Sequence, residues 1–454
     1  MDIRLRNTKK KIDHLKAKDY NVVEMWACRF KEMCLLNQNV SDFINGQTFE
    51  EPLDPREGFF GGRTEMFVKY ATAEDETVIK YFDYCSLYPY ICKYGKFPTG
   101  HPTIHIDLNC MPTDFTNMVG FAKVILLPPK QLLFPVLPAK VGGKLIFGLC
   151  FKCMEQSNPE SCSHADNERQ IKGTWVCCEL QKALSLGYKL VQVLEVWEYQ
   201  STQFDSVSKS GGIFAKYIDT FLKIKQEASG YPSWVKTEED KNEYIRRMAE
   251  REQVTLDKDK IDHNPGLRSI AKMALNSLWL VSNITSFSQK KTFFPSILFL
   301  MFCLHRGKFS QRADMPQTSI VGEKDKLLDL LNNPGVEVGD IVSLDSMLVV
   351  NWRHVAEDLP TADFSSVAVA AHVTAQARLH LYSALEFLGE RVLYCDTDSV
   401  FFTEKPGDPI IEKGDYLGQL TDELDSWPGS YISEFVCGKN SFFWFSTPRT
   451  CRIF

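Results

Sequence analysis

Residues 393–402 restrict the fold more than any other stretch, because two apolar runs there flank a pair of closely spaced aspartates. The pattern Leu-Tyr-Cys-Asp-Thr-Asp-Ser-Val-Phe-Phe predicts a strand, a tight turn and a second strand. If the chain is extended there, Asp396 and Asp398 point the same way and place two negative charges in one small site. Such a pair is costly unless a cation neutralises it, and a divalent cation with oxygen ligands is the usual solution. The alternative is an ordinary hairpin with an acidic turn.

A third carboxylate, Asp83, lies far upstream. Residues 78–82 predict a strand. Ser86 is a candidate N-cap for a helix that begins there, and Pro89 is tolerated in the first turn of that helix. Asp83 therefore stands at the C-terminal end of a strand and faces a helix N-terminus, whose amide groups favour anionic phosphate. This junction suits a site for a metal ion and a triphosphate.

A further motif is a predicted helix that opens with Asn264 as its cap and Pro265 as its first residue. At helical spacing, one face carries cationic and polar residues and ends in an aromatic ring: Arg268, Lys272, Asn276 and Trp279. Another face is apolar: Leu267, Ile270, Ala274 and Leu278. The first face suits a nucleotide, because the charges bind phosphate and the ring contacts the base. Taken alone, the pattern also fits an amphipathic surface helix.

Together, D-x-x-S-L-Y-P at 83–89, K-x3-N-S-L-W at 272–279 and Y-C-D-T-D-S at 394–399 resemble the motifs of family B DNA polymerases, in the same order. The chain is most similar to the protein-primed branch of phages, adenoviruses and the transposons called Polintons or Mavericks, over roughly residues 20–440. The resemblance implies template-directed deoxynucleotidyl transfer with two Mg²⁺ ions. Asp83 and Asp398 would hold both ions, with Asp396 nearby. Lys272 would protonate the leaving pyrophosphate.

The resemblance also implies which residues bind the nucleotide and the DNA. Arg268 and Lys272 would hold the triphosphate. Tyr88 would lie under the sugar and exclude a 2′-hydroxyl, and Trp279 would contact the nascent base pair. The whole expected nucleotide set is Tyr84 (through its carbonyl), Ser86, Leu87, Tyr88, Arg268, Asn276, Trp279, Tyr394 and Thr397. The expected DNA contacts are a double glycine with its arginine and a lysine near the C-terminus: Gly61, Gly62, Arg63 and Lys439. The implied partners are template-primer DNA, deoxynucleoside triphosphates and a terminal priming protein.

Composition limits where such a protein would act. Lys and Arg total 52 against 58 Asp and Glu, a net charge of −6, so local basic clusters would have to attract nucleic acid. Fourteen cysteines without a signal peptide favour a reducing, intracellular compartment, and the expected location is the nucleus. The longest apolar run, 293–304, is about a dozen residues, so no membrane span is expected. Residues 1–20 predict a basic helix and residues 37–58 a polar linker.

A metal-ligand pattern lies between the first two motifs. Cys150-x2-Cys153-x8-Cys162-x-His164 places three cysteines and one histidine within fifteen residues. This set matches a closed, tetrahedral zinc site, and the alternative is a group of free thiols in a loop. By resemblance, this segment corresponds to the insertion that grips the template and the terminal protein and supports strand displacement.

The family pattern breaks after Trp279. The expected Gly-Lys-Phe does not follow at Leu280 but returns at Gly307, and removal of Leu280–Arg306, 27 residues, restores it. We interpret this phenylalanine-rich segment as a retained intron, and the alternative is a tolerated loop insertion. Its phenylalanines are expected to be exposed, and its deletion is expected to raise solubility and nucleotide incorporation.

The expected fold class is α+β: an antiparallel polymerase palm sheet that carries the aspartates, helical fingers and an inserted zinc-bearing subdomain. The expected divisions are 1–60 (N-terminal remnant or linker), 61–105 (first palm part), 106–212 (inserted subdomain), 213–306 (fingers), 307–440 (second palm part) and 441–454 (aberrant tail). No exonuclease motif precedes Gly61 and no thumb-sized segment follows the last palm part. The expectation is therefore a truncated chain without proofreading.

Three alternatives from other classes remain. A reverse transcriptase would place its two aspartates side by side, whereas Thr397 separates them here. A catalytically inactive relic would keep the fold and bind nucleic acid without turnover. A zinc scaffold would bind no triphosphate.

Overall fold

The computed structural model divides the chain into two compact units, residues 1–52 and 53–454. The residues it describes are 2–18, 20–46, 50–74, 76–106, 111–157, 161–232, 234–280, 317–321, 324–333, 335–344, 347–354, 366–426, 431–437, 444–446 and 451–453. The first unit contains α1 (Asp2–Lys16), α2 (Ala27–Leu36) and α3 (Gln38–Gly46). The helix α1 confirms the basic helix predicted near the N-terminus. The prediction of a linker is wrong for residues 38–46, where Val40, Phe43 and Ile44 recur at helical spacing.

The second unit is built around an antiparallel sheet that contains the aspartate motif. In spatial order its strands are β1 (Thr64–Met66), β13 (Val392–Asp396), β14 (Ser399–Glu404), β3 (Val78–Tyr84) and β15 (Leu420–Asp422). The strands β13 and β14 confirm the predicted strand, turn and strand. The central strands are apolar on both faces, because helices cover one side and a second apolar cluster around Leu393 and Phe435 covers the other.

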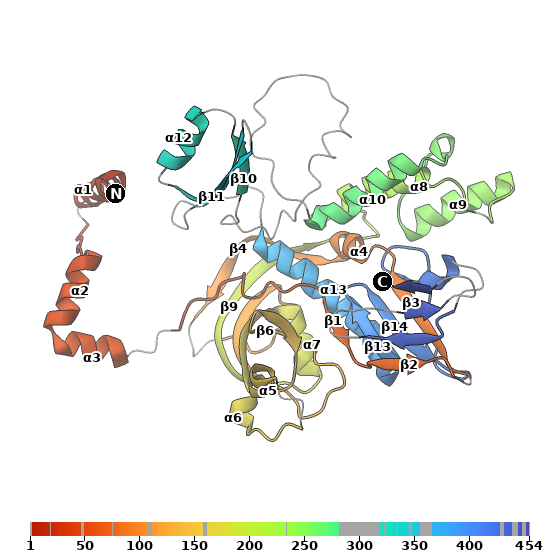
Figure 1. Ribbon diagram of the computed structural model, residues 1–454, viewed down its shortest axis with the longest axis horizontal. Coiled ribbons are helices and arrows are strands. Elements are labelled where there is room, and N and C mark those ends of the chain that lie inside the picture. The colour runs from red at the N-terminus through yellow and green to blue at the C-terminus, as the bar shows by residue number, and fades with distance from the viewer. Residues whose placement is uncertain are drawn as a thin grey trace. The chain divides into compact units, whose positions relative to one another are not determined.

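The helix α13 (Val367–Leu388) is the main support of this sheet, and Figure 1 shows it in light blue beside β13 and β14. It leads, through the short 3-10 helix that follows it, into the strand pair of the aspartate motif. Ser366 caps it, with its hydroxyl accepting the Val369 N–H at 3.3 Å. Leu381 and Leu385 are fully buried in the same core as Phe402 of β14. The helix also packs against α4 (Leu87–Tyr94) and α7 (Cys177–Ser185).

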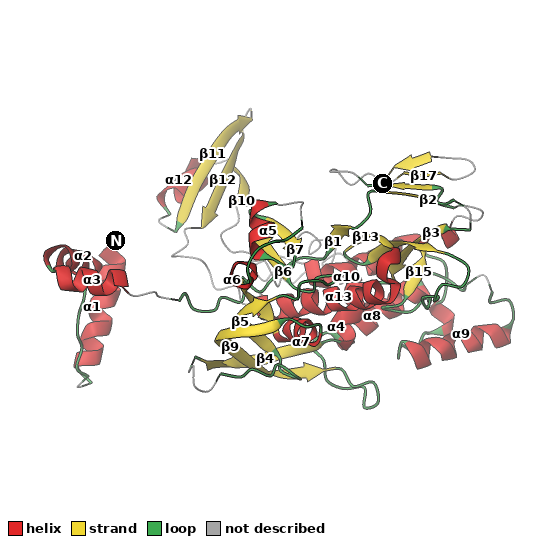
Figure 2. Cartoon of the chain, turned by 90° about the horizontal axis from the view of Figure 1, so that it is seen from below, coloured by secondary structure: helices red, strands yellow, loops and turns green. Residues whose placement is uncertain are grey.

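A second antiparallel sheet follows α4 in the chain. Its strands, in spatial order, are β4 (Lys96–His105), β9 (Lys189–Gln203), β5 (Gly120–Leu127) and β8 (Ile171–Val176). Between β5 and β8 the chain forms the hairpin β6 (Pro138–Val141) and β7 (Lys144–Phe147), then α5 (Phe151–Gln156) and α6 (Asp166–Arg169). Figure 2 shows β4, β9 and β5 as one curved sheet. Residues 120–147 thus contribute three strands, β5, β6 and β7.

The helices expected after residue 213 are present: α8 (Ala215–Glu227), α9 (Glu238–Arg251), the short 3-10 helix η1 (Lys258–Lys260) and α10 (Pro265–Leu280). Asn264 caps α10 as predicted, because its side chain accepts the Leu267 N–H at 3.0 Å. The apolar face of α10 packs on α8, with Ala271, Ala274 and Leu275 buried. Figure 1 shows both helices in green beside α4.

The remaining elements lie outside these two sheets. They are β2 (Tyr70–Thr72) paired with β16 (Glu434–Val436), β10 (Gln317–Val321), α12 (Lys324–Asn332), β11 (Val336–Leu344), β12 (Met347–His354), η3 (Gly389–Arg391), η4 (Glu423–Ser426), and β17 (Trp444–Ser446) paired with β18 (Cys451–Ile453). Apart from Leu280, which ends α10, the segment interpreted as an intron lies outside the described residues, and so does Gly307. No helix within the described residues has the length and apolar character needed to cross a membrane.

Candidate active site

The aspartates 83 and 398 meet at a cavity of about 570 Å³, here called the central pocket. It is lined by Asp83, Tyr84, Cys85, Ser86, Leu87, Tyr88, Pro89, Lys225, Lys272, Thr397, Asp398, Thr421 and Glu423. The lining comes from β3 and the start of α4, from the turn between β13 and β14, from β15 and η4, and from the facing sides of α8 and α10. Sequence segments that lie far apart in the chain therefore form one site.

Strand register brings Asp83 and Asp398 together. Asp83 lies opposite Ser399 in the antiparallel pair of β3 and β14, so the residue before Ser399 stands at the end of β3. The Tyr84 N–H donates to the Asp398 carbonyl at 2.8 Å and fixes that turn against β3. On the other side, the Thr421 hydroxyl donates to the Asp83 carbonyl at 3.1 Å. Hydrogen bonds to the backbone carbonyls of Asp83 and Asp398 thus hold the two aspartates at the pocket.

Burial and neighbouring negative charges make the ionised forms of Asp83 and Asp398 unfavourable when no cation is bound. Burial, followed by the charges of Asp398 and Glu423, raises the pKa of Asp83 to about 7, and Lys272 opposes this shift. Burial and then the charge of Asp396 raise the pKa of Asp398 to about 6. Like charges held close in a partly dry site favour protonation unless a cation replaces the proton. The pair therefore has the oxygen donors and the unmet negative charge that suit a hard divalent cation.

A cationic wall faces the carboxylates. Lys272 lines the pocket from α10, as the sequence predicted, and Arg268 lies one turn earlier on the same helix, where its Nε donates to the Ser229 hydroxyl at 3.1 Å. Lys225 of α8 lines the pocket as well. Burial lowers the pKa of Lys225, and the nearby charges of Arg268 and Lys272 lower it further. Two lysines that line the pocket, with Arg268 close enough for its charge to act on Lys225, suit a polyanion such as a triphosphate.

Sequence reasoning missed Lys225 and Glu423. A signal for Lys225 existed, because it falls at helical spacing after Ile218 and Leu222 and so places a lysine on the buried face of α8. Glu423 has no comparable signal. It lies in a short acidic run that is typical of a surface turn, and only the pairing of β15 with β3 brings it to the pocket.

Asp396 is not among the residues that line the central pocket, and its expected role at the metal site stays a prediction. Asp396 ends β13, and Thr397 then adopts a positive φ of 56°, so the alternation of an extended strand stops between the two aspartates. The Asp396 Oδ1 atom accepts hydrogen bonds from the Thr64 hydroxyl at 2.8 Å and from the Thr397 hydroxyl at 3.0 Å. The Tyr394 hydroxyl lies 3.5 Å from Oδ2. Asp396 is thus a bonded neighbour that raises the pKa of Asp398.

The residues after Asp83 line the central pocket, and their expected contacts with the nucleotide stay predictions. Leu87 is buried and Tyr88 lines the pocket, where burial and the charge of Asp398 raise the pKa of Tyr88 to about 12. The Tyr84 ring is buried, and its hydroxyl donates to the His380 carbonyl at 3.2 Å. Ser86 precedes α4, but its side chain makes no capping hydrogen bond, so that prediction is wrong. Its backbone is left-handed, with φ at 52°, which is not the extended conformation of a capping residue.

Arg63 is a structural residue and not a DNA contact, contrary to the prediction. Its side chain is 1% exposed, forms an ion pair with Glu65 at 2.6 Å, and donates to the Pro135 carbonyl at 2.8 Å. The Arg63 carbonyl accepts the Thr397 N–H at 2.8 Å, so this residue supports the aspartate turn. A guanidinium that is enclosed in this way is not accessible to a phosphate of DNA.

The double glycine also contacts the aspartate turn. A Cβ atom on Gly62 would lie 2.7 Å from Thr397 Oγ1, whereas one on Gly61 would meet nothing within 4 Å. Gly62 therefore lets the chain pass close to Thr397. Gly61 and Phe60 are held by Arg378 of α13, whose Nη1 donates to both carbonyls at 2.7 Å. A DNA contact by Gly61 or Gly62 stays a prediction.

Three of the expected residues are described in part or not at all. Asn276 and Trp279 belong to α10, but their side chains lie outside the described residues. Lys439 lies outside the described residues entirely. Their expected contacts with the nucleotide and the DNA stay predictions.

The cysteine and histidine motif forms a compact Cys3His cluster that could bind zinc. The donor atoms of Cys150, Cys153, Cys162 and His164 all lie within 4.8 Å of one another. None of the four lines the central pocket. The structure thus brings together the four residues that the sequence nominated.

Comparisons with known proteins relate the chain to one group of enzymes. Residues 29–249 match the family described as DNA polymerase type B, organellar and viral. Among solved structures, phi29 DNA polymerase in an orthorhombic crystal form is 14% identical with a TM-score of 0.47, over 84% of this chain and 47% of that one. The complex of phi29 DNA polymerase with primer-template DNA and incoming nucleotides is 14% identical with a TM-score of 0.45, over 88% of this chain and 53% of that one. This chain thus spans about half the length of these structures. No curated protein matches the sequence.

Proposed function

Because the chain belongs, through residues 29–249, to the organellar and viral type B DNA polymerases, we propose that its central pocket carries out template-directed deoxynucleotidyl transfer. The observation that supports this most is the division of charge in the pocket. Asp83 and Asp398 form one wall, and Lys225 and Lys272 line the same cavity from the facing helices. A deoxynucleoside triphosphate with Mg²⁺ requires both, because the cation binds carboxylate oxygens and the phosphates bind ammonium groups.

The carboxylates fit the metal ions that this chemistry uses. Asp83 and Asp398 would hold Mg²⁺, since their raised pKa values report negative charge that a divalent cation would neutralise. When bound, two such ions activate the primer 3′-hydroxyl and stabilise the charge of the triphosphate. Asp396 would act from outside the pocket. It accepts two threonine hydroxyls and so holds the turn that presents Asp398.

The cationic residues would have two roles toward the triphosphate, binding of its oxygens and proton transfer. Lys225, Arg268 and Lys272 would bind the phosphate oxygens, and Lys272 would give a proton to the leaving pyrophosphate. Tyr88 would stack beneath the deoxyribose and exclude a 2′-hydroxyl, because its ring lines the pocket at the start of α4. We also assign Trp279 to the nascent base pair and Asn276 to the nucleotide.

The wider assignment follows from the same function. We assign residues 61–105 and 307–440 to the palm, 106–212 to an inserted subdomain and 213–306 to the fingers. The partners would be template-primer DNA, deoxynucleoside triphosphates and a terminal priming protein, and the enzyme would act in the nucleus. Its origin would be a mobile element or a virus.

Primer extension tests the proposal. The full chain, with a labelled primer-template, four deoxynucleoside triphosphates and Mg²⁺, should extend the primer. Asp398→Ala should lower the rate by at least about 100-fold, because it removes a metal ligand. Asp259→Asn, an exposed carboxylate on η1, is the matched control and should leave the rate unchanged. Equal extension by wild type and Asp398→Ala would refute the assignment. DNA binding without extension by the wild type would favour the inactive relic.

A further inference from the structure

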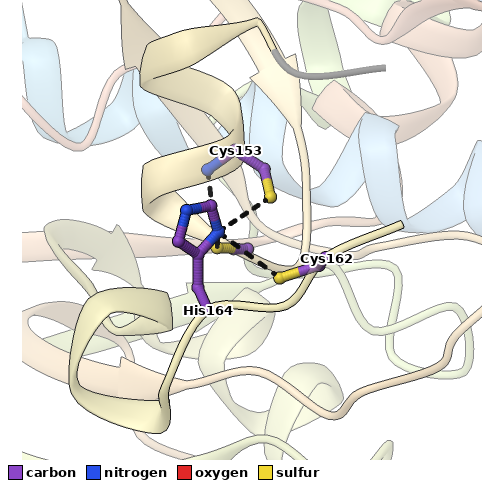
Figure 3. A group of neighbouring side chains, drawn as sticks. Cys153, Cys162 and His164 are labelled. Carbon is purple, nitrogen blue, oxygen red and sulfur yellow. Dashed lines mark hydrogen bonds between the residues drawn. The ribbon is translucent and has the colours of Figure 1, made fainter. Parts of the chain in front are cut away.

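Four potential metal ligands converge at a place that the polymerase reaction does not use. The Nδ1 atom of His164 lies 3.6 Å from the sulfur of Cys150, 3.3 Å from that of Cys153 and 3.7 Å from that of Cys162 (Figure 3). One nitrogen is thus nearly equidistant from three sulfur atoms. A chance group of thiols has no reason to surround one imidazole nitrogen in this way.

These distances are those of a tetrahedral zinc site. With Zn–S and Zn–N bonds of about 2.3 and 2.0 Å, the sulfur-to-nitrogen edge of a tetrahedron is about 3.5 Å. The three observed edges, 3.3, 3.6 and 3.7 Å, bracket that value. We propose that Cys150, Cys153, Cys162 and His164 bind one Zn²⁺ ion in a closed, structural site. All four positions are filled by protein ligands, so no position is left for a catalytic water.

The local backbone prepares the first two ligands. Cys150 is buried and stands as the N-cap of α5, where its sulfur accepts the Cys153 N–H at 3.4 Å. This hydrogen bond holds the Cys150 sulfur at the start of α5, beside Cys153. Figure 3 shows Cys162 and His164 approaching the same point from the loop before α6.

The site would stabilise a segment that has almost no core of its own. Within the described residues of 150–170, the buried side chains are Cys150, Met154 and Arg169. A single buried methionine stabilises too little to hold such a segment, because folding must offset the conformational entropy of every ordered residue. A bound zinc ion supplies the missing stabilisation, as in small metal-dependent domains.

Arg169 links this segment to the second sheet. Its side chain is 5% exposed, and its Nη2 atom donates to the carbonyls of Pro128 and Pro129 at 2.8 Å each. These prolines directly follow β5. Zinc would therefore hold residues 150–169 in the shape that lets Arg169 bind the end of β5. Loss of zinc should therefore disorder residues 150–169 and break the contact of Arg169 with the end of β5. The sheet that carries the aspartates should stay intact.

Metal analysis of the purified full chain tests the zinc assignment. Elemental analysis should find about one zinc per chain, and replacement by Co²⁺ should give the intense visible bands and thiolate charge-transfer bands of a tetrahedral site. Cys153→Ala and His164→Ala should each lose the zinc and the spectrum. Cys28→Ser, an exposed cysteine of the first unit, should keep both. A chain without zinc, or an octahedral cobalt spectrum, would overturn the proposal.

Hydrogen exchange tests the structural role with the same proteins. In Cys153→Ala, amides of residues 149–169 should exchange at least ten-fold faster, while those of residues 78–94 and 367–404 should keep their protection. Cys28→Ser should match the wild type throughout. Unchanged exchange at residues 149–169 after loss of the metal would overturn the structural role. A global rise in exchange would overturn the claim that the effect is local.

Discussion

Metal binding at the central pocket should depend on pH in a range where ordinary carboxylates do not titrate. The pKa of Asp83 lies at about 7 and that of Asp398 at about 6. Because a carboxylate must lose its proton to bind a cation, the affinity for a divalent ion should follow the fraction of molecules in which both groups are ionised. The experiment compares the affinity of the pocket for Mn²⁺ at pH 8 and at pH 6.

The size of the effect follows from the two pKa values. Both groups are ionised in about 0.9 of the molecules at pH 8 and in about 0.05 at pH 6, so Mn²⁺ affinity should fall by about 20-fold. If both groups kept pKa values near 4, the same change of pH would alter the affinity by only about 2%. The direction of the pH effect on metal affinity is also determined. Raised pKa values make protons stronger competitors, so acid weakens binding.

Electron paramagnetic resonance of free Mn²⁺ gives the affinity directly. The protein is first saturated with Zn²⁺ at the Cys3His cluster, and an Asp83→Asn/Asp398→Asn double variant provides the background from other sites. The difference between the two proteins should show the 20-fold loss from pH 8 to pH 6. A difference affinity that changes less than two-fold would refute the electrostatic reasoning.

The same shifts predict the stability of the metal-free protein. The pKa values of Asp83 and Asp398 in the folded state lie above those in the unfolded state, so the folded protein binds more protons between about pH 4 and pH 7. The free energy of unfolding should therefore fall as the pH rises through that window. Saturating Mn²⁺ should restore it at pH 8 and have little effect at pH 5, as thermal unfolding will show. Equal stabilisation by Mn²⁺ at both pH values would contradict the sign.

Three substitutions test other parts of the site. Gly62→Ala places a Cβ 2.7 Å from Thr397 Oγ1 and should lower the extension rate, whereas Gly61→Ala, whose Cβ meets nothing within 4 Å, should not. Lys225→Ala should raise the KM for the deoxynucleoside triphosphate by about 10-fold in steady-state kinetics with little change in Tm, while Lys223→Ala should leave KM unchanged. Arg378→Met should cost about 3–5 kcal/mol in denaturant unfolding, because it leaves buried Glu179 unpaired. Wild-type values for Gly62→Ala, Lys225→Ala or Arg378→Met would contradict the role given to that residue.

Much of the framework could be predicted from local sequence. The strands on either side of Thr397 and the helix that begins after Asn264 were predictable because their apolar period, cap and turn residues act within a few positions. The position of Asp83 at the end of β3 followed in the same way. The convergence of Cys150, Cys153, Cys162 and His164 was predictable because ligand spacing within fifteen residues constrains their geometry.

The remaining features depend on tertiary contacts that no local pattern encodes. Arg63 looked like a phosphate ligand beside two glycines, but Glu65 and the Pro135 carbonyl enclose it. Asp396 looked equivalent to Asp398, but the chain is not extended at Thr397, and the Asp396 carboxylate accepts the Thr64 and Thr397 hydroxyls. Lys225 and Glu423 reach the pocket only because α8 packs on α10 and β15 pairs with β3. Charged residues are common on surfaces, so their type alone does not reveal such a role.

Anomalous diffraction from crystals soaked with Mn²⁺ and a non-hydrolysable deoxynucleoside triphosphate tests the central claim most directly. The claim is that Asp83 and Asp398 share a divalent cation opposite Lys225 and Lys272. The expected result is manganese density bound by both carboxylates, with the phosphates extending toward the lysines. Manganese absent from the central pocket, or bound there with neither Asp83 nor Asp398 as a ligand, would contradict it.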